Sequence, residues 1–175
     1  MITPAYVRTM AAYNRAMNER LYGAAARLTD AERRREQGAF FGSIHGTLSH
    51  LLWGDSIWLS RFSDWPKPAV PLKESPRIIE DFAELARHRE KLDAAISAWA
   101  QAMDEAWLAA DQTWVNSAGH QRTAPRALLV THMFNHQTHH RGQAHALITR
   151  AGEKTGDTDL MIIVPEIVNG GPRPS

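Results

Sequence analysis

The sequence predicts an all-α protein, a four-helix bundle with a short hairpin before its last long helix. Three observations lead to this prediction. Four long stretches carry apolar residues three and four positions apart, which is the spacing of an amphipathic helix. Only one short segment between them has the pattern of paired extended strands. No internal repeat is visible, so we expect the four helices to enclose one core in a single domain of residues 1–175.

Capping signals and helix breakers set the limits of these elements. A threonine–proline pair begins the first helix, a glycine–serine pair the second, and a serine–proline pair the third. Three prolines in residues 64–71 exclude a helix there. Near the C-terminus, we expect residues 160–164 to form a short packed segment and residues 170–174 to be frayed. The predicted helices cover residues 4–28, 43–62, 76–110 and 124–151, and the hairpin covers 111–122.

Composition and charge argue against several classes of function. The 175 residues have a net charge of +1, so no strong electric field attracts nucleic acid or an anionic membrane. The absence of cysteine excludes disulfides, thiolate nucleophiles and cysteine-based zinc sites, and it fits a cytoplasmic protein. No apolar run approaches the roughly 20 residues of a membrane span. We also expect no signal peptide, because no basic segment precedes an apolar block.

The most informative segment is residues 131–143, which holds four of the nine histidines. His136 and His140 are four residues apart, so on a helix they point the same way, one turn apart. Two such imidazoles can hold one divalent ion at about 2.0–2.1 Å. Imidazoles crowded on an apolar helix cost desolvation energy unless their nitrogens find partners, and a metal is such a partner. The pattern therefore predicts a metal-binding histidine pair; the alternatives are a polar network or a histidine-lined interface.

The second helix offers a third ligand. His45 and His50 lie five residues apart and so face about 140° away from each other on a helix. His50 shares its side with apolar residues, and we expect it to point into the bundle, where facing helices place metal ligands. We expect His45 at the surface or in a cap. His88, which stands in a charged run, is predicted to be exposed.

Two segments carry a resemblance to a known family. Residues 43–55, Ser-Ile-His-Gly-Thr-Leu-Ser-His-Leu-Leu-Trp-Gly-Asp, and residues 135–143, Asn-His-Gln-Thr-His-His-Arg-Gly-Gln, together resemble the damage-inducible DinB family, within the YfiT-like metalloenzyme group. The resemblance extends from about residue 13 to about residue 160. It implies an up-down-down-up bundle, usually as a homodimer. It also implies one divalent metal ion, typically nickel or zinc, held by His50, His136 and His140.

The same resemblance implies chemistry on small molecules, as thiol-dependent transferases or isomerases or as hydrolases. Three neutral imidazoles leave coordination positions open for a water or a low-molecular-weight thiol. We therefore expect a metal-dependent transferase or hydrolase acting on a small-molecule substrate, with no catalytic base identified. The alternative is a bundle that binds metal or ligand without turnover.

Three further residues are candidates to orient a ligand, to donate a hydrogen bond to it or to bind the substrate. Asp55 can orient an imidazole, although an ordinary surface acid is an equal alternative. His139 can donate a hydrogen bond to a ligand. Arg141 can bind a substrate carboxylate, but the favoured interpretation is a salt bridge within the bundle.

Overall fold

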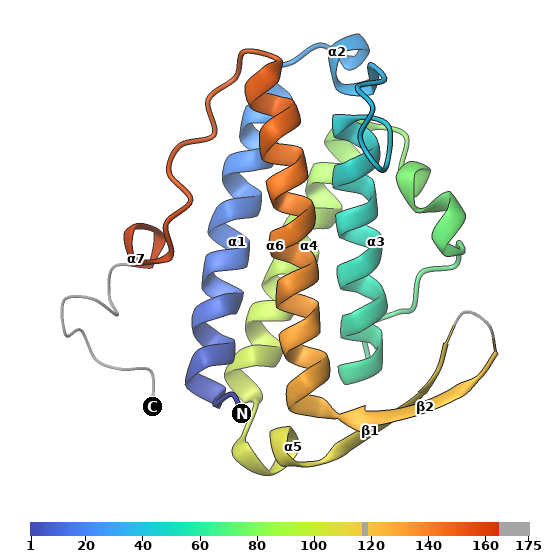
Figure 1. Cartoon of the computed structure of the whole chain (residues 1–175), viewed down its shortest axis with the longest axis vertical. Coiled ribbons are helices and arrows are strands. Elements are labelled where there is room, and N and C mark those ends of the chain that lie inside the picture. The colour runs from blue at the N-terminus through green and yellow to red at the C-terminus, as the bar shows by residue number, and fades with distance from the viewer. Residues whose placement is uncertain (117–118, 165–175) are drawn as a thin grey trace.

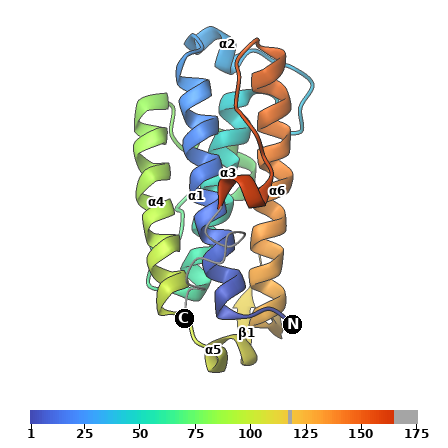
Figure 2. The same ribbon diagram turned by 90° about the vertical axis from the view of Figure 1, so that its left-hand side faces the viewer.

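The structure is a computed structural model that describes residues 1–116 and 119–164. It confirms a mostly helical protein with two short strands. Four long helices lie side by side in both views of the molecule (Figures 1 and 2). In Figure 1 the chain runs upward in the first and last of them and downward in the two between. The long helices are α1 (Pro4–Ala26), α3 (Ile44–Phe62), α4 (Phe82–Ala102) and α6 (Arg126–Arg150).

Shorter elements connect the long helices. The predicted hairpin is present: β1 and β2 pair antiparallel, with Asp111 opposite Pro125. It projects from the end of the molecule where α6 begins (Figure 1). The shorter elements are α2 (Asp30–Arg34), the 3-10 helix η1 (Leu72–Arg77), α5 (Glu105–Ala109), β1 (Asp111–Val115), β2 (Gln121–Pro125) and α7 (Leu160–Ile163).

The single helix predicted over residues 76–110 is wrong at both ends. The serine–proline pair thought to begin it lies inside η1, and α4 begins only after Asp81, whose carboxylate accepts a hydrogen bond from the Glu84 amide at 2.7 Å. At the other end, the Asp104 carboxylate accepts from the Trp107 amide at 2.7 Å and begins α5 as a separate helix. Two aspartate caps therefore set the starts of α4 and α5. They were not predicted because the serine–proline pair and the continuous apolar spacing indicated one long helix.

Residues 160–164 match the prediction of a short packed segment only in part. Val164 is buried, whereas Leu160, Met161 and Ile162 are 41–64% exposed. The predicted frayed residues 170–174 lie outside the described part of the chain.

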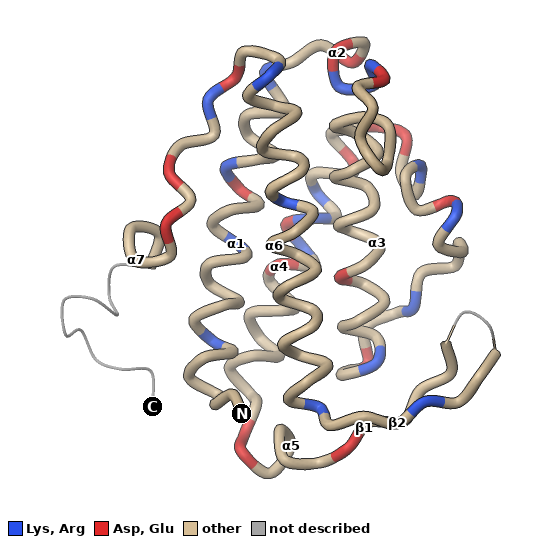
Figure 3. The backbone as a smooth tube through the Cα atoms, viewed as in Figure 1, with Lys and Arg blue, Asp and Glu red and all other residues tan. Residues whose placement is uncertain are grey.

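Positive and negative residues are interspersed along the described backbone (Figure 3). Among all the described residues, no helix is long and apolar enough to cross a membrane.

Candidate metal centre

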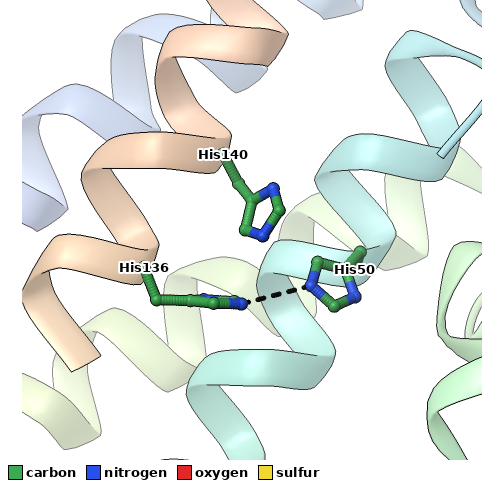
Figure 4. Close-up of side chains that lie close together, drawn as sticks. All are labelled: His50, His136 and His140. Atoms are coloured by element: carbon green, nitrogen blue, oxygen red, sulfur yellow. Dashed lines mark hydrogen bonds between the residues drawn. The ribbon is translucent and has the colours of Figure 1, made fainter. Parts of the chain in front are cut away.

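The three histidines predicted as ligands meet where α3 faces α6 (Figure 4). The Nε2 atoms of His50 and His136 are 3.3 Å apart, and one ring nitrogen from each of His50, His136 and His140 lies within 4.8 Å of the others. Nitrogens that share one tetrahedral ion at about 2.0–2.1 Å are roughly 3.4 Å apart. Small side-chain rotations are therefore sufficient to bring all three nitrogens onto one ion.

Two neighbours orient the ligand imidazoles. The Nδ1 atom of His140 lies 2.7 Å from Gln143 Oε1, and since a carboxamide oxygen only accepts, Nδ1 carries the proton. The Nδ1 atom of His50 lies 2.9 Å from the hydroxyl of the fully buried Ser75, which can accept in the same way. Both contacts leave the Nε2 lone pair free for a metal, which is how metal-binding histidines are commonly held.

His136 depends on a glycine in the facing helix. A Cβ atom added at Gly54 would lie 2.7 Å from Cε1 and 3.3 Å from Nδ1 of the His136 ring. Real Cβ atoms do not approach so closely, so the ring occupies space that only glycine leaves open. Among the described residues, the buried Nδ1 of His136 has no hydrogen-bond partner. Gly54 is thus a determinant of the site that the sequence pattern did not reveal.

Aromatic rings cover the site on the side of the loop between α2 and α3. The Phe41 ring stacks on His50 with a centroid distance of 3.7 Å and lies 5.3 Å from His140. Trp53 stacks on His50 at 5.9 Å and is fixed by a hydrogen bond from Nε1 to the Val70 carbonyl. Both rings therefore place apolar surface against the His50 imidazole.

Exposure of the histidines shows where the site opens. His50 and His140 are buried, and His136 is half-buried. His132 and His139 are exposed; the first lies 6.1 Å from His136 and the second 4.8 Å from His140, measured between ring centroids. Of the three ligands, His136 is thus the most exposed, and its exposed neighbours lie on the solvent side of α6.

Burial also keeps the ligands neutral. Burial, with smaller contributions from the neighbouring histidines, lowers the pKa of His50 to about 3 and that of His136 to about 4. Burial likewise lowers the pKa of His140. At pH 7 all three imidazoles are in the uncharged form that binds metal.

Comparison with known proteins identifies the family. The model of the DinB family matches residues 1–164. The chain belongs to the DinB family. No curated protein and no solved structure matches it. The resemblance carried by residues 43–55 and 135–143 is thereby confirmed, and the match extends it to residue 1.

The residues predicted to support the ligands of this DinB protein have other contacts in the described part of the chain. The Asp55 carboxylate accepts from Arg89 Nη1 at 2.7 Å, and Arg89 Nη2 donates to Asp93 Oδ1 at 2.8 Å. Asn14 and Asn18 donate to the same Asp93 carboxylate. All five side chains are at most 3% exposed. Asp55 thus belongs to a buried ionic network that the sequence analysis missed.

Arg141 lies inside the bundle, where the favoured interpretation placed it, although its hydrogen-bond partners among the described residues are neutral. Arg141 is buried and donates to Asn14 Oδ1 and, at 3.3 Å, to Thr138 Oγ1. His139 is exposed, and within the described residues no hydrogen bond joins it to a ligand. The expectation for His45 is wrong: it is 2% exposed, and its Nε2 donates to the Ile79 carbonyl at 2.9 Å. His88 is exposed as predicted.

Substitution of Gly54 by alanine should weaken metal binding in this DinB protein about 10- to 100-fold, the range for residues that orient ligands. The new methyl group would push the His136 ring away from the shared ion. Competition with a chromophoric chelator measures the affinity. Gly23→Ala in α1 is the matched control, because its Cβ would meet nothing within 4 Å. Equal affinities for the two variants would show that the ring position is unimportant.

Acid should destabilise the metal-free protein. An unfolded histidine takes up a proton near pH 6.5, whereas His50 and His136 do so only near pH 3 and 4 when folded. Between these values the unfolded chain holds more protons, so stability falls as the pH drops from 7 towards 4. Each imidazole contributes up to about 1.4 kcal/mol per pH unit.

Urea unfolding of chelator-treated protein at pH 7, 6 and 5 measures this loss. The double variant His50→Gln with His136→Gln is the control and should show a flatter dependence on pH. An unchanged slope in the double variant would assign the acid sensitivity to other groups.

Proposed function

We propose that this DinB-family protein is a metal-dependent enzyme that transfers a small thiol to a small-molecule substrate. His50, His136 and His140 would hold one divalent ion, nickel or zinc. The observation that carries the proposal is the convergence of three neutral imidazoles from two helices, with a ring nitrogen from each within 4.8 Å of the others. We also interpret the four long helices as the up-down-down-up bundle of the family, and we propose a homodimer, as the resemblance implies. A cytoplasmic location, which the absence of cysteine fits, is proposed as well.

The residues present fit a divalent cation. Uncharged nitrogen ligands suit nickel and zinc. Gln143 holds the Nδ1 proton of His140 away from the ion, and Ser75 can do the same for His50. When bound by three neutral ligands, such an ion supplies an uncompensated positive charge that lowers the pKa of a thiol or a water in a remaining position.

Thiol transfer is favoured over hydrolysis by what surrounds the ligands. Phe41 and Trp53 stack on the His50 imidazole and place apolar surface beside the ligands. Among the described residues, the buried carboxylates Asp55 and Asp93 are paired with Arg89, and neither forms a hydrogen bond with a ligand imidazole. A thiol is far more acidic than water, so on the same ion it would lose its proton more readily, and the thiolate attacks without a general base.

Elemental analysis and activity of untagged protein test the proposal. We expect about one nickel or zinc ion per chain, and conjugation of a low-molecular-weight thiol to an electrophile that stops on chelation and returns with metal. Protein purified without metal that takes up none would refute the metal site. Stoichiometric metal with no turnover across thiol and ester panels would favour a non-catalytic binding protein. Light scattering of the same samples tests the homodimer.

A further inference from the structure

A cationic and aromatic cluster lies beside the metal centre, where α3, α6 and the hairpin meet. The Arg61 guanidinium carbon lies 4.3 Å from the centroid of the Trp58 ring and 5.8 Å from that of Trp114 on β1. The Trp58 ring in turn lies 5.0 Å from the ring of His132 on α6. None of these residues contributes to the ligand set or to the buried Arg89 network.

No carboxylate forms an ion pair with Arg61 within the described residues. Its side chain is half-buried, yet it makes no ion pair and no hydrogen bond there, and burial alone lowers its pKa. The other arginine stacked on a tryptophan of this end, Arg126 over Trp107, donates hydrogen bonds to Gln112 Oε1 and the Trp107 carbonyl. A partly dehydrated guanidinium keeps its five donors unsatisfied unless an anion or water provides acceptors.

The cluster adjoins the metal centre through His132, a solvent-exposed neighbour of His136 on α6. His132 is one helical turn from the ligand His136, and their ring centroids are 6.1 Å apart. On the facing helix, Gly54 touches His136, and Arg61 follows seven residues later, roughly 10 Å along the axis. A small extended molecule with one end at the three histidines can therefore place its other end at Arg61.

We propose that Arg61, between Trp58 and Trp114, binds an oxyanion, a carboxylate or a phosphate, at the far end of the thiol or substrate. Guanidinium groups bind these anions through paired, charge-assisted hydrogen bonds. The flanking indole rings keep the guanidinium in place and contact the apolar chain between the two ends. This inference rests on the proposed function, since it places the reacting end at the metal centre.

Probe thiols of matched length test the inference on metal-loaded protein. Mercaptoalkanoates, mercaptoalkyl phosphates and mercaptoalcohols of increasing chain length would be titrated while tryptophan fluorescence is followed. We expect an anionic probe of about 10 Å to bind about 10- to 100-fold more tightly than the alcohol of the same length. The shortest probes should show no preference, and the two anion series will show which oxyanion is preferred.

Two variants decide the role of Arg61. Arg61→Gln should reduce the preference for the anion to less than about twofold, while metal content and affinity for the mercaptoalcohols stay unchanged. Arg87→Gln, at an exposed position of α4, removes the same charge and should keep the full preference. A preference that survives in Arg61→Gln, or that is lost equally in Arg87→Gln, would overturn the inference.

A sulfur-free series separates this inference from the proposed function. Alkanoates and alkanols would be added to the same metal-loaded proteins. Tighter binding of alkanoates to the wild type than to Arg61→Gln supports the anion site even if no thiol binds, in which case only the thiol transfer is refuted. Equal binding of alkanoates to both proteins, with thiol binding intact, refutes the anion site alone.

Discussion

Replacement of His136 by alanine should remove stoichiometric metal from the protein while leaving its helical content unchanged. The ring nitrogens of His50 and His140 would remain, but two neutral ligands on different helices hold a divalent ion far more weakly than three. Because loss of a residue that merely orients a ligand already costs about 10- to 100-fold, we expect the affinity to fall by more than about a hundredfold. Elemental analysis, chelator competition and circular dichroism measure the effects.

His139→Ala is the matched control for this substitution. His139 is on the same helix, and its ring lies 4.8 Å from that of His140, but it is exposed. Metal affinity should remain within about threefold of the wild type, because no ligand is lost. If both variants retain one ion per chain, the three-histidine centre is refuted. If His136→Ala loses its helicity together with the metal, the ion has a structural role.

The candidate ligand set could be predicted because helix geometry and the apolar pattern relate its members. The i,i+4 spacing of His136 and His140 fixes their common direction, and the apolar neighbours of His50 fix the side it faces. Both inferences need only one helix at a time. The meeting of the two helices then follows from the amphipathic pattern, and the structure brings the three rings together.

The buried network around Arg89 could not be recognised from composition, because runs of charged residues are usually exposed. Arg89 stands in the run Arg87-His88-Arg89-Glu90, yet it is 2% exposed. The signal that could have found it is its register, since it falls between the core positions Leu85 and Leu92, and Asp93 follows at i+4. A helix position is buried by its direction, and a charge placed there is tolerated only when it is paired.

Other parts of the site depend on tertiary contacts that no local pattern encodes. Phe41 comes from the loop before α3, and Ser75 comes from η1, a turn that the sequence presented as a helix start. His45 was assigned to the surface or a cap because it faces away from His50. The segment after η1 covers that side, and the Ile79 carbonyl accepts a hydrogen bond from His45. The side of a helix on which a residue lies is predictable from the sequence. The element that packs against that side is not.

Removal of the Arg89 charge should cause a large loss of stability. Arg89 donates to Asp55 at 2.7 Å and to Asp93 at 2.8 Å, and all three side chains are at most 3% exposed. Arg89→Met keeps an apolar chain of similar length but leaves two buried carboxylates without their main counter-charge. Breaking a buried pair in this way costs about 3–5 kcal/mol, a large part of the 5–15 kcal/mol that stabilises a typical domain. Urea unfolding at pH 7 measures the loss.

Two further variants separate the charge from the packing. Arg87→Met, two residues earlier on an exposed face of α4, should change the free energy of unfolding by less than about 0.5 kcal/mol. Adding Asp55→Asn and Asp93→Asn to Arg89→Met should restore part of the stability, because amides carry no charge to be compensated. A triple variant no more stable than Arg89→Met would mean that lost packing, and not an unpaired charge, is responsible.

The dependence of this loss on pH has a definite sign. Even beside Arg89, burial raises the pKa of Asp93 to about 6, and without the guanidinium the pKa must be higher still. A carboxyl group with a folded pKa above its unfolded value binds its proton first in the native state, so acid stabilises the native state of the variant more than that of the wild type. The stability difference between wild type and Arg89→Met should therefore shrink as the pH falls from 7 to 5. A stability difference that stays constant would mean that the negative charge of this network is not carried by Asp93.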